Sequence, residues 1–462
     1  MRNCNTNVRV TGHPDSGAPC TLTGGTGSAG KGGYAVLATG GNVEAVDAEL
    51  TGSDGTTSGG CAIDTVSGSV KVSGSRLVSG ASGSLAGRFG VGSVQGGVEL
   101  RDSTVHAGAS REKAGGAAVD WVNRTSGSTL VSGCELVGGD SEADRGGFAA
   151  YLVGGPDNAG ASLTVENSTL TAGSGRAEGG AGIATVAGDV TVTNSQVFAG
   201  DARDGAAGRG GHGVDTSKYG TASGFVPSTG NLTVQDSRIE GGDCAAESGC
   251  GIYCQTGDIV LTKTGAEGAS CVVTSGSGPS GCGIRNADTG TGDVTVSGAT
   301  VQSAQDSAVY ALQATVSVSG DDALVEGYRD HTSALFPAVW CKNLTLSSGK
   351  LLSHGGVNTL NLWGSLLMTG GVIAHDTSDK YAVVALGNAS TSLGYDGSFA
   401  AIGGGSIDVV DGGIGIAANK KGDSVQTYYL QEGADTQWRL PAMDEGTRQS
   451  FAVTALASDG SA

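Results

Sequence analysis

A pattern of about ten residues recurs along the chain and limits its fold more than any other feature. With Φ for an apolar residue, it is Φ-x-Φ-x-(N/D/G)-(S/A)-x-Φ-x-x-G. A unit that repeats this often, every 22 to 42 residues, indicates a solenoid in which each coil packs only on its neighbours. Clear copies begin at Val70, Val98, Leu163, Val190 and Leu232, and looser copies begin at Val43, Thr129, Ile259, Val294, Val316, Leu344 and Leu366.

Each copy predicts two short strands joined by a bend. The Φ-x-Φ alternation is typical of a strand with one buried face. The fifth position is Asn, Asp or Gly in ten of the twelve copies, and these residues tolerate a left-handed backbone. We therefore expect a one-residue bend there, and a ladder of hydrogen bonds between Asn167 and Asn194 on adjacent coils. The twelve residues are Asp47, Gly74, Asp102, Gly133, Asn167, Asn194, Asp236, Lys263, Gly298, Gly320, Ser348 and Gly370.

A third strand follows a Gly-rich loop in each unit, with the frame x-(A/G)-(I/V)-x. Examples are GCAID at 60–64, GAAVD at 116–120 and GCGIR at 281–285. Three short strands per turn predict an all-β fold, a right-handed parallel β-helix of about 13 coils stacked about 4.8 Å apart. We expect an N-terminal cap over 1–30, the β-helix over 31–415, and a C-terminal cap, or a linker to a further module, over 416–462.

The amino-acid composition limits the environments and the binding partners that are compatible with this chain. Aromatic residues make up 5% of the chain, so the core must be narrow and filled by small aliphatic side chains. The formal net charge is −19 and no Lys/Arg cluster occurs, which argues against nucleic acid and anionic membranes as partners. No apolar run reaches about 18 residues, so we expect no membrane insertion. These features favour an extracellular or bacterial cell-surface protein, a monomer within a longer multidomain precursor.

Two segments carry a resemblance to a known family. CGIYCQTGDIVLT from Cys250 and CGIRNADTGTGDVTVSGATV from Cys282 resemble the Gly-Ile repeats of bacterial surface β-helix proteins. Those proteins belong to the pectate-lyase-like superfamily and are described as carbohydrate-binding or adhesin-like. The resemblance covers about residues 31–415. It implies an extracellular protein that faces polysaccharide, and it transfers no catalytic residue.

The third strand provides the first candidate binding surface. Because its Ile or Val points inward, the next residue points outward. Aromatic rings and carboxylates about one coil apart could stack on sugar rings and bind their hydroxyls, although an ordinary solvated face would look similar. We assign ligand binding to Tyr253, Arg285, Tyr310 and Trp340. The full set of outward residues is Asp64, Asp120, Ala184, Asp215, Tyr253, Arg285, Tyr310, Trp340 and Val384.

An insertion between Val190 and Leu232 provides the second candidate surface, with His212, Asp215 and Tyr219 as ligand-binding residues. Its Gly-His-Gly triplet at 211–213 resembles a motif of polygalacturonase-type hydrolases. In that family the triplet works with an Asn-Thr-Asp motif, which is missing here, and with Arg-Ile-Lys, where this chain has Arg238-Ile239-Glu240. We therefore assign no catalytic residue.

The ten cysteines favour buried, reduced thiols over a disulfide framework or a metal site. In the strand alternation, Cys250, Cys254 and Cys282 fall on the same inward-facing side as the neighbouring isoleucines. Cys61 and Cys341 occupy comparable positions. A Cys250–Cys282 bridge and a Cys4–Cys20 bridge stay open as alternatives. We expect no cofactor and no metal, with calcium as an alternative at carboxylates of the bend column.

The function predicted from the sequence is a non-catalytic module that binds polysaccharide, such as a host or cell-wall glycan, or acts as an adhesin or stalk. The alternative is a polysaccharide lyase or glycoside hydrolase that acts on an acidic polysaccharide, with its site near His212 and Asp215. Lyase chemistry needs a base together with calcium or Arg beside the uronate. The chain shows no cluster of basic residues that would supply it.

Overall fold

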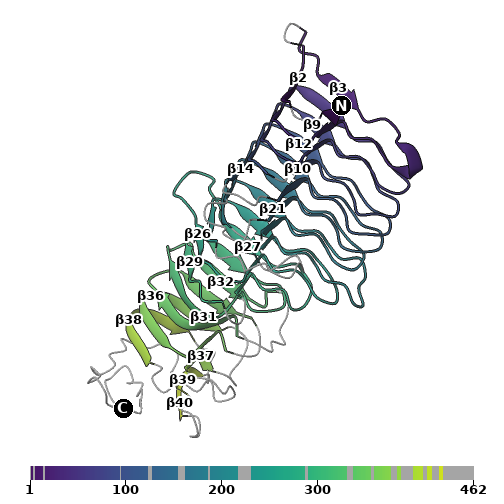
Figure 1. Cartoon of the computed structure of the whole chain (residues 1–462). Coiled ribbons are helices and arrows are strands. Elements are labelled where there is room, and N and C mark those ends of the chain that lie inside the picture. Colours follow the sequence, from purple (N-terminus) through teal and green to yellow (C-terminus); the bar gives the residue numbers. More distant parts are fainter. Residues whose placement is uncertain are drawn as a thin grey trace. The chain divides into compact units, whose positions relative to one another are not determined.

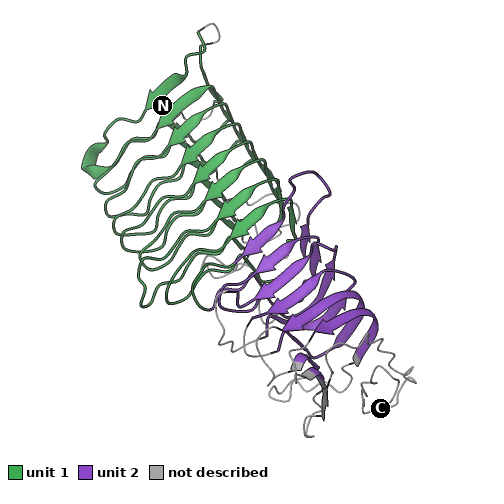
Figure 2. Cartoon of the chain, turned by 180° about the vertical axis from the view of Figure 1, so that it is seen from behind, with its two compact units in different colours: residues 1–257, 275–279 green, residues 258–274, 280–462 purple. Residues whose placement is uncertain are grey.

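The computed structural model places nearly every strand in parallel coils (Figure 1). Two compact units are distinguished (Figure 2): unit 1 comprises Met1–Gly257 with Ser275–Pro279, and unit 2 comprises Asp258–Thr274 with Ser280–Ala462. Each has the architecture of a right-handed parallel β-helix, as predicted. The structure describes residues 2–3, 6–13, 16–93, 95–122, 127–153, 162–185, 188–216, 230–286, 290–329, 337–354, 358–375, 382–386, 399–408, 414–418 and 426–429.

Unit 1 passes through three parallel sheets in every coil. Sheet 1 contains β2 (Val8–Thr11), β5 (Val43–Val46), β8 (Val70–Ser73), β11 (Val98–Arg101), β14 (Ser128–Ser132), β17 (Ser162–Glu166), β20 (Asp189–Thr193) and β23 (Leu232–Gln235). Sheet 2 contains β3 (Cys20–Thr23), β6 (Ala48–Thr51), β9 (Arg76–Val78), β12 (Thr104–His106), β15 (Glu135–Val137), β18 (Thr169–Thr171), β21 (Gln196–Phe198) and β24 (Arg238–Glu240). Sheet 3 contains β1 (Arg2–Asn3), β4 (Val36–Ala38), β7 (Ile63–Thr65), β10 (Val91–Ser93), β13 (Val119–Val122), β16 (Ala150–Val153), β19 (Ile183–Thr185), β22 (Val214–Asp215) and β25 (Ile252–Cys254).

Unit 2 keeps the same three-sheet plan, but several of its strands run on from one sheet into the next. Its short strands are β26 (Ile259–Thr262), β27 (Val272–Thr274), β28 (Ile284–Asn286), β29 (Val294–Ser297), β30 (Thr300–Gln302), β32 (Leu324–Gly327), β34 (Lys350–Ser353), β35 (Leu360–Leu362), β37 (Ala382–Leu386) and β39 (Ile414–Ala418). Its long strands are β31 (Val309–Ser319), β33 (Val339–Leu346), β36 (Ser365–His375) and β38 (Phe399–Asp408).

The two ends expected to be caps both contain strands. Within 1–30, strands β1, β2 and β3 pair in parallel with β4, β5 and β6, and a 3₁₀ turn covers Ser28–Gly30. Within 416–462, the described strand β40 (Gln426–Tyr429) runs antiparallel to β39. The first segment thus adds a coil to the stack, whereas β40 departs from the parallel pattern.

The predicted alternation of buried and outward residues is present in the strands. In β8, Val70 and Val72 are buried whereas Lys71 is exposed. Trp121 and Trp363 are the largest fully buried side chains among the described residues, and the indole N–H of Trp121 donates to the carbonyl of Gly96. Burial of apolar surface contributes roughly 25 cal/mol per Å² to stability, so these side chains stabilise the packing of each coil on its neighbours.

The predicted bends are left-handed in most copies. The φ angle is +49° at Asp47, +46° at Asp102 and +49° at Asp236, and Asn194 Nδ2 donates to Asn167 Oδ1 over 2.7 Å as expected. Three assignments were wrong. The left-handed residues are Gly349 and Gly371 rather than Ser348 and Gly370, and Lys263 has no positive φ. Glycine takes the bend in those copies because it lacks the Cβ that penalises this conformation.

A serine ladder explains why serine follows most of the bends in unit 1. The hydroxyl of Ser168 accepts the backbone N–H of Cys134 over 3.0 Å, and that of Ser195 accepts the N–H of Ser168 over 3.1 Å. Each hydroxyl also donates to a carbonyl two residues earlier, at 2.7 Å for both. The ladder therefore satisfies backbone groups at a corner where strand pairing is interrupted.

The Gly-rich loops of unit 1 form a layer of their own. Each loop runs out from sheet 2 and returns to sheet 3, and we call it an arm; Figure 1 shows the arms lying side by side. Backbone hydrogen bonds join the two sides of one arm, as from Gly147 N–H to Gly139 over 2.7 Å, and link successive arms, as from Gly173 N–H to Gly147 over 2.8 Å. A Cβ on Gly147 would lie 1.9 Å from the Gly116 oxygen. This close approach explains why the arms are so rich in glycine.

Candidate ligand-binding rows on sheet 3

The outward residues of sheet 3 form one row in each unit, which we call the outer row. In-register pairing places each member directly opposite the next, about 4.8 Å away. In unit 1 the row is Leu37, Asp64, Gly92, Asp120, Tyr151, Ala184, Asp215 and Tyr253. In unit 2 it is Arg285, Tyr310, Trp340, Asn361 and Ala385.

Eight of the nine residues expected to point outward belong to these rows. Val384 is the exception: it pairs with Leu360 in the core and is fully buried, whereas Ala385 takes the outward position. Two consecutive valines at 383–384 fit either alternation, so the sequence pattern could not distinguish the two registers. The pattern also missed Gly92 and Tyr151, because their coils, GRFGVGS and GFAAYLV, depart from the usual frame.

A second row lies beside the outer row in unit 1, three residues earlier in each coil, where the arm returns to the sheet. We call it the entry row: Tyr34, Cys61, Phe89, Ala117, Phe148, Ala181, His212 and Cys250. The rings of Phe148 and Tyr151 stack with centroids 4.9 Å apart and pack against Ala117, Ala181 and Ala184. Small residues on neighbouring coils thus make room for one stacked aromatic pair.

The entry row corrects the prediction for two cysteines. None of the nine described cysteines is in a disulfide, so neither proposed bridge forms through Cys20, Cys250 or Cys282. Cys61 and Cys250 are buried, but they interact with Arg88 and His212 rather than with the core of the coil. Ile63 and Ile252 point into the core of the coil. The cysteines two residues earlier do not, because the chain bends between the arm and the strand. Burial raises the pKa of Cys61 to about 12.

Arg88 is the cation at the centre of one cluster. It donates a hydrogen bond to the Tyr34 hydroxyl, and its guanidinium lies 5.4 Å from the Tyr34 ring centroid and 5.9 Å from that of Phe89. Burial raises the pKa of Asp64, and the nearby Arg88 opposes that rise. A Cβ on Gly92 would lie 3.1 Å from Phe89 Cδ2 and 3.2 Å from Asp64 Oδ1, so both side chains lean over this glycine.

Asp120 is a carboxyl group of the outer row with a strongly perturbed pKa. Burial, with a smaller contribution from Asp64, raises its pKa to about 7. Its Oδ1 atom is buried without a hydrogen-bond partner, and the same holds for Nε of Arg88. An unsatisfied buried polar atom costs about 1–3 kcal/mol, so such atoms are uncommon unless a ligand or water completes them. The sequence placed Asp120 on the row but did not indicate this burial.

His212, Asp215 and Tyr253 lie together at the other end of the unit 1 row. The His212 and Tyr253 rings stack at 5.0 Å and 16°, and His212 Nε2 lies 4.0 Å from Asp215 Oδ2. His212 Nδ1 accepts the backbone N–H of Cys250 over 3.0 Å, and Asp215 is 1% exposed. Tyr219, assigned to the same surface, lies outside the described residues.

The outer row of unit 2 is mainly aromatic. The Arg285 guanidinium lies 5.1 Å from the Tyr310 ring centroid, and Tyr310 meets Trp340 edge to face at 5.5 Å. Trp340 also meets Trp363 edge to face at 5.7 Å. Trp363 is buried and supports Trp340 from the next coil. The sequence pattern did not identify Trp363, because it follows β35 rather than occupying a strand position.

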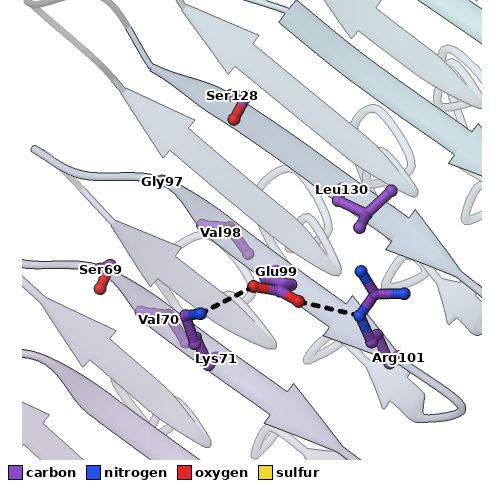
Figure 3. A pocket seen from close by; sticks show the side chains of 9 residues that line it. All are labelled: Ser69, Val70, Lys71, Gly97, Val98, Glu99, Arg101, Ser128 and Leu130. Carbon is purple, nitrogen blue, oxygen red and sulfur yellow. Dashed lines mark hydrogen bonds and ion pairs between the residues drawn. The ribbon is translucent and has the colours of Figure 1, made fainter.

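A shallow cavity of about 260 Å³ lies on sheet 1 of unit 1 (Figure 3). Glu99 is bound there by Lys71 at 3.1 Å and by Arg101 at 2.8 Å. These contacts lower the Glu99 pKa, with the Arg101 hydrogen bond as the largest cause. Because Lys71 and Arg101 are both engaged by Glu99, we assign no ligand to this cavity.

Among the residues that the structure describes, no group of three or more His, Cys, Asp or Glu side chains is placed to hold a metal ion. Among them, too, no helix is long and apolar enough to cross a membrane.

Comparisons with known proteins add no assignment. No family model, no curated protein and no solved structure matches the chain. The parallel β-helix is therefore established by the structure itself, and the resemblance to the pectate-lyase-like superfamily stays a prediction.

Proposed function

We propose that the chain is a non-catalytic β-helix module of an extracellular or bacterial cell-surface protein and that it binds polysaccharide along the outer rows of sheet 3. The resemblance to bacterial surface β-helix repeats and the acidic, Gly-rich composition support this environment. Adhesion to a glycan-bearing surface would follow from the same binding.

The observation that carries the proposal is the ordered sequence of side chains along the rows. In unit 2, Arg285, Tyr310 and Trp340 occupy successive coils in register, and Trp363 supports the last ring. Rings held by neighbours lose little conformational freedom when a ligand binds, and they offer apolar surface for the C–H faces of sugars. A regular spacing of about 4.8 Å suits a ligand that is itself a repeating polymer.

Charge favours an uncharged polysaccharide over an acidic one. The chain carries a net charge of −19, and the unit 1 row adds Asp64, Asp120 and Asp215. A polyuronate would be repelled over the distance set by ionic screening, about 8 Å at physiological salt. The catalytic alternative receives little support at His212 and Asp215, because Asp215 is almost fully buried and His212 Nδ1 already accepts the N–H of Cys250.

The test is a binding measurement with the double variant Tyr310→Ala/Trp340→Ala. We expect binding to an immobilised neutral glycan to weaken at least about tenfold, since each aromatic contact contributes on the order of 1 kcal/mol. Phe198→Ala is the matched control, because Phe198 is a partly buried aromatic on sheet 2 beside Arg238, away from the rows. Equal binding by the wild type and the double variant would exclude the unit 2 row as the binding surface.

A further inference from the structure

The aromatic rings on the outer row of unit 2 do not share a plane, and this limits the kind of polysaccharide that the row can bind. We propose that this row binds single, dissolved chains of an uncharged polysaccharide and not the flat face of a crystalline one. This inference rests on the proposed function and specifies the physical form of the polysaccharide that binds there.

Neighbouring rings of the row stand edge to face. The planes of Tyr310 and Trp340 meet at 84° with their centroids 5.5 Å apart, and the planes of Trp340 and Trp363 meet at 67°. The face of a polysaccharide crystal is planar, so it stacks only on rings that lie in one common plane. Such a face would meet one ring of the row at most, whereas the sugar residues of a dissolved chain can turn to follow inclined rings.

Packing holds the rings at these inclinations. The guanidinium of Arg285 lies 5.1 Å from the Tyr310 centroid, and in-register pairing places Arg285 and Trp340 on opposite sides of Tyr310. Trp340 is held in turn by Trp363, which is 1% exposed. Rotating Tyr310 and Trp340 into a common plane would break these contacts, so the row does not flatten against a planar ligand.

Polar side chains flank the two rings along the same row. Arg285 lies one coil before Tyr310, and Asn361 lies one coil after Trp340. A guanidinium carries five N–H donors, and a carboxamide carries two donors and an acceptor. The hydroxyl groups of a dissolved chain lose water on binding and need new hydrogen-bond partners. In a crystal, neighbouring chains already provide those partners, so this order of polar and aromatic side chains favours the dissolved chain.

The row is also short. Arg285, Tyr310, Trp340 and Asn361 occupy four successive coils, which are separated by three intervals of about 4.8 Å. A segment of a few sugar residues covers this length. We therefore expect a soluble hexasaccharide to bind as tightly as a longer dissolved chain of the same sugar.

The experiment compares the dissolved and crystalline forms of the same sugar polymers. The full chain is titrated calorimetrically with cellohexaose, N-acetylated chitohexaose and mannohexaose. It is also mixed with microcrystalline cellulose, crystalline chitin and crystalline mannan, and the protein left in solution is measured. We expect at least one hexasaccharide to bind and no crystal to deplete the protein.

Two variants connect this binding to the row. Trp340→Ala should weaken binding of the hexasaccharide at least about tenfold, because it removes a ring that contacts the sugar. Phe198→Ala should bind like the wild type. It is the matched control, because the Phe198 ring also lies beside a guanidinium, that of Arg238 at 5.8 Å, but on sheet 2. Circular dichroism of each variant verifies that the β-helix is intact.

The possible results distinguish failure of this inference from failure of the proposed function. Depletion of the wild type by any crystal refutes the inference, and the proposed function stands if Tyr310→Ala/Trp340→Ala abolishes that depletion. Equal binding of a hexasaccharide by the wild type and Trp340→Ala also refutes the inference, because the sugar then binds elsewhere. If none of the six glycans binds, both the inference and the proposed function are overturned.

Discussion

Replacing Gly147 by alanine should destabilise unit 1 by about 3–5 kcal/mol. The new methyl group would have to occupy a position 1.9 Å from the carbonyl oxygen of Gly116, so the arms must move apart. That movement breaks hydrogen bonds between these two arms, from the N–H of Gly139 to Gly116 and from the N–H of Gly115 to Arg145, each worth about 1 kcal/mol. Overpacking adds about 1–3 kcal/mol, because the obstacle is backbone rather than a flexible side chain.

Urea unfolding followed by far-ultraviolet circular dichroism measures this loss. Gly25→Ala is the matched control, since it makes the same chemical change where a Cβ meets nothing within 4 Å. We expect the control to unfold at the same urea concentration as the wild type or slightly above it, because alanine restricts the unfolded chain. If Gly147→Ala unfolds together with the control, the arms do not form the tightly bonded layer described above.

Asp120→Asn should stabilise the protein at alkaline pH and have little effect at acidic pH. Burial raises the folded-state pKa of Asp120 from 3.8 to about 7, so the folded protein retains a proton that the unfolded chain has lost. Stability therefore falls as pH rises from about 4 to about 7, and the full cost is present above pH 7. A pKa difference of this size corresponds to about 4 kcal/mol.

Asparagine carries no ionisable group at this position, so the variant should escape that loss. We expect the stability difference between Asp120→Asn and the wild type to be close to zero at pH 4 and to reach several kcal/mol at pH 8, measured by urea unfolding at each pH. The pH 4 measurement is the internal control for steric effects of the amide. A difference that does not change with pH would show that Asp120 is not held in a poorly solvated site.

The repeat made the fold predictable from the sequence because each of its positions reflects a local requirement of one coil. Buried valines and leucines, the left-handed bends at Asp102 and Asn167, and the order of three strands follow from alternation and from backbone preferences. These are properties of single coils, and stacking identical coils needs no further information. The same reasoning failed at Val384, where adjacent valines allow two registers.

The candidate site was less predictable because it depends on contacts between coils. Tyr253 and Trp340 could be placed on the row from their strand positions. The burial of Asp120, the stacking of Phe148 on Tyr151 and the contact of Arg88 with Tyr34 join residues up to 54 positions apart. The glycine layer was also missed, since a Gly-rich segment reads as a flexible loop until its hydrogen-bond partners on adjacent arms are known.

Hydrogen–deuterium exchange in the presence of a bound neutral polysaccharide tests most directly whether sheet 3 is the binding surface. We expect slower exchange in the strands and returning arms that carry the outer and entry rows, including 86–93, 116–122 and 146–153. Exchange should be unchanged in strands of sheets 1 and 2 such as Val98–Arg101 and Thr104–His106. Protection confined to sheets 1 and 2, with sheet 3 unchanged, would contradict this assignment.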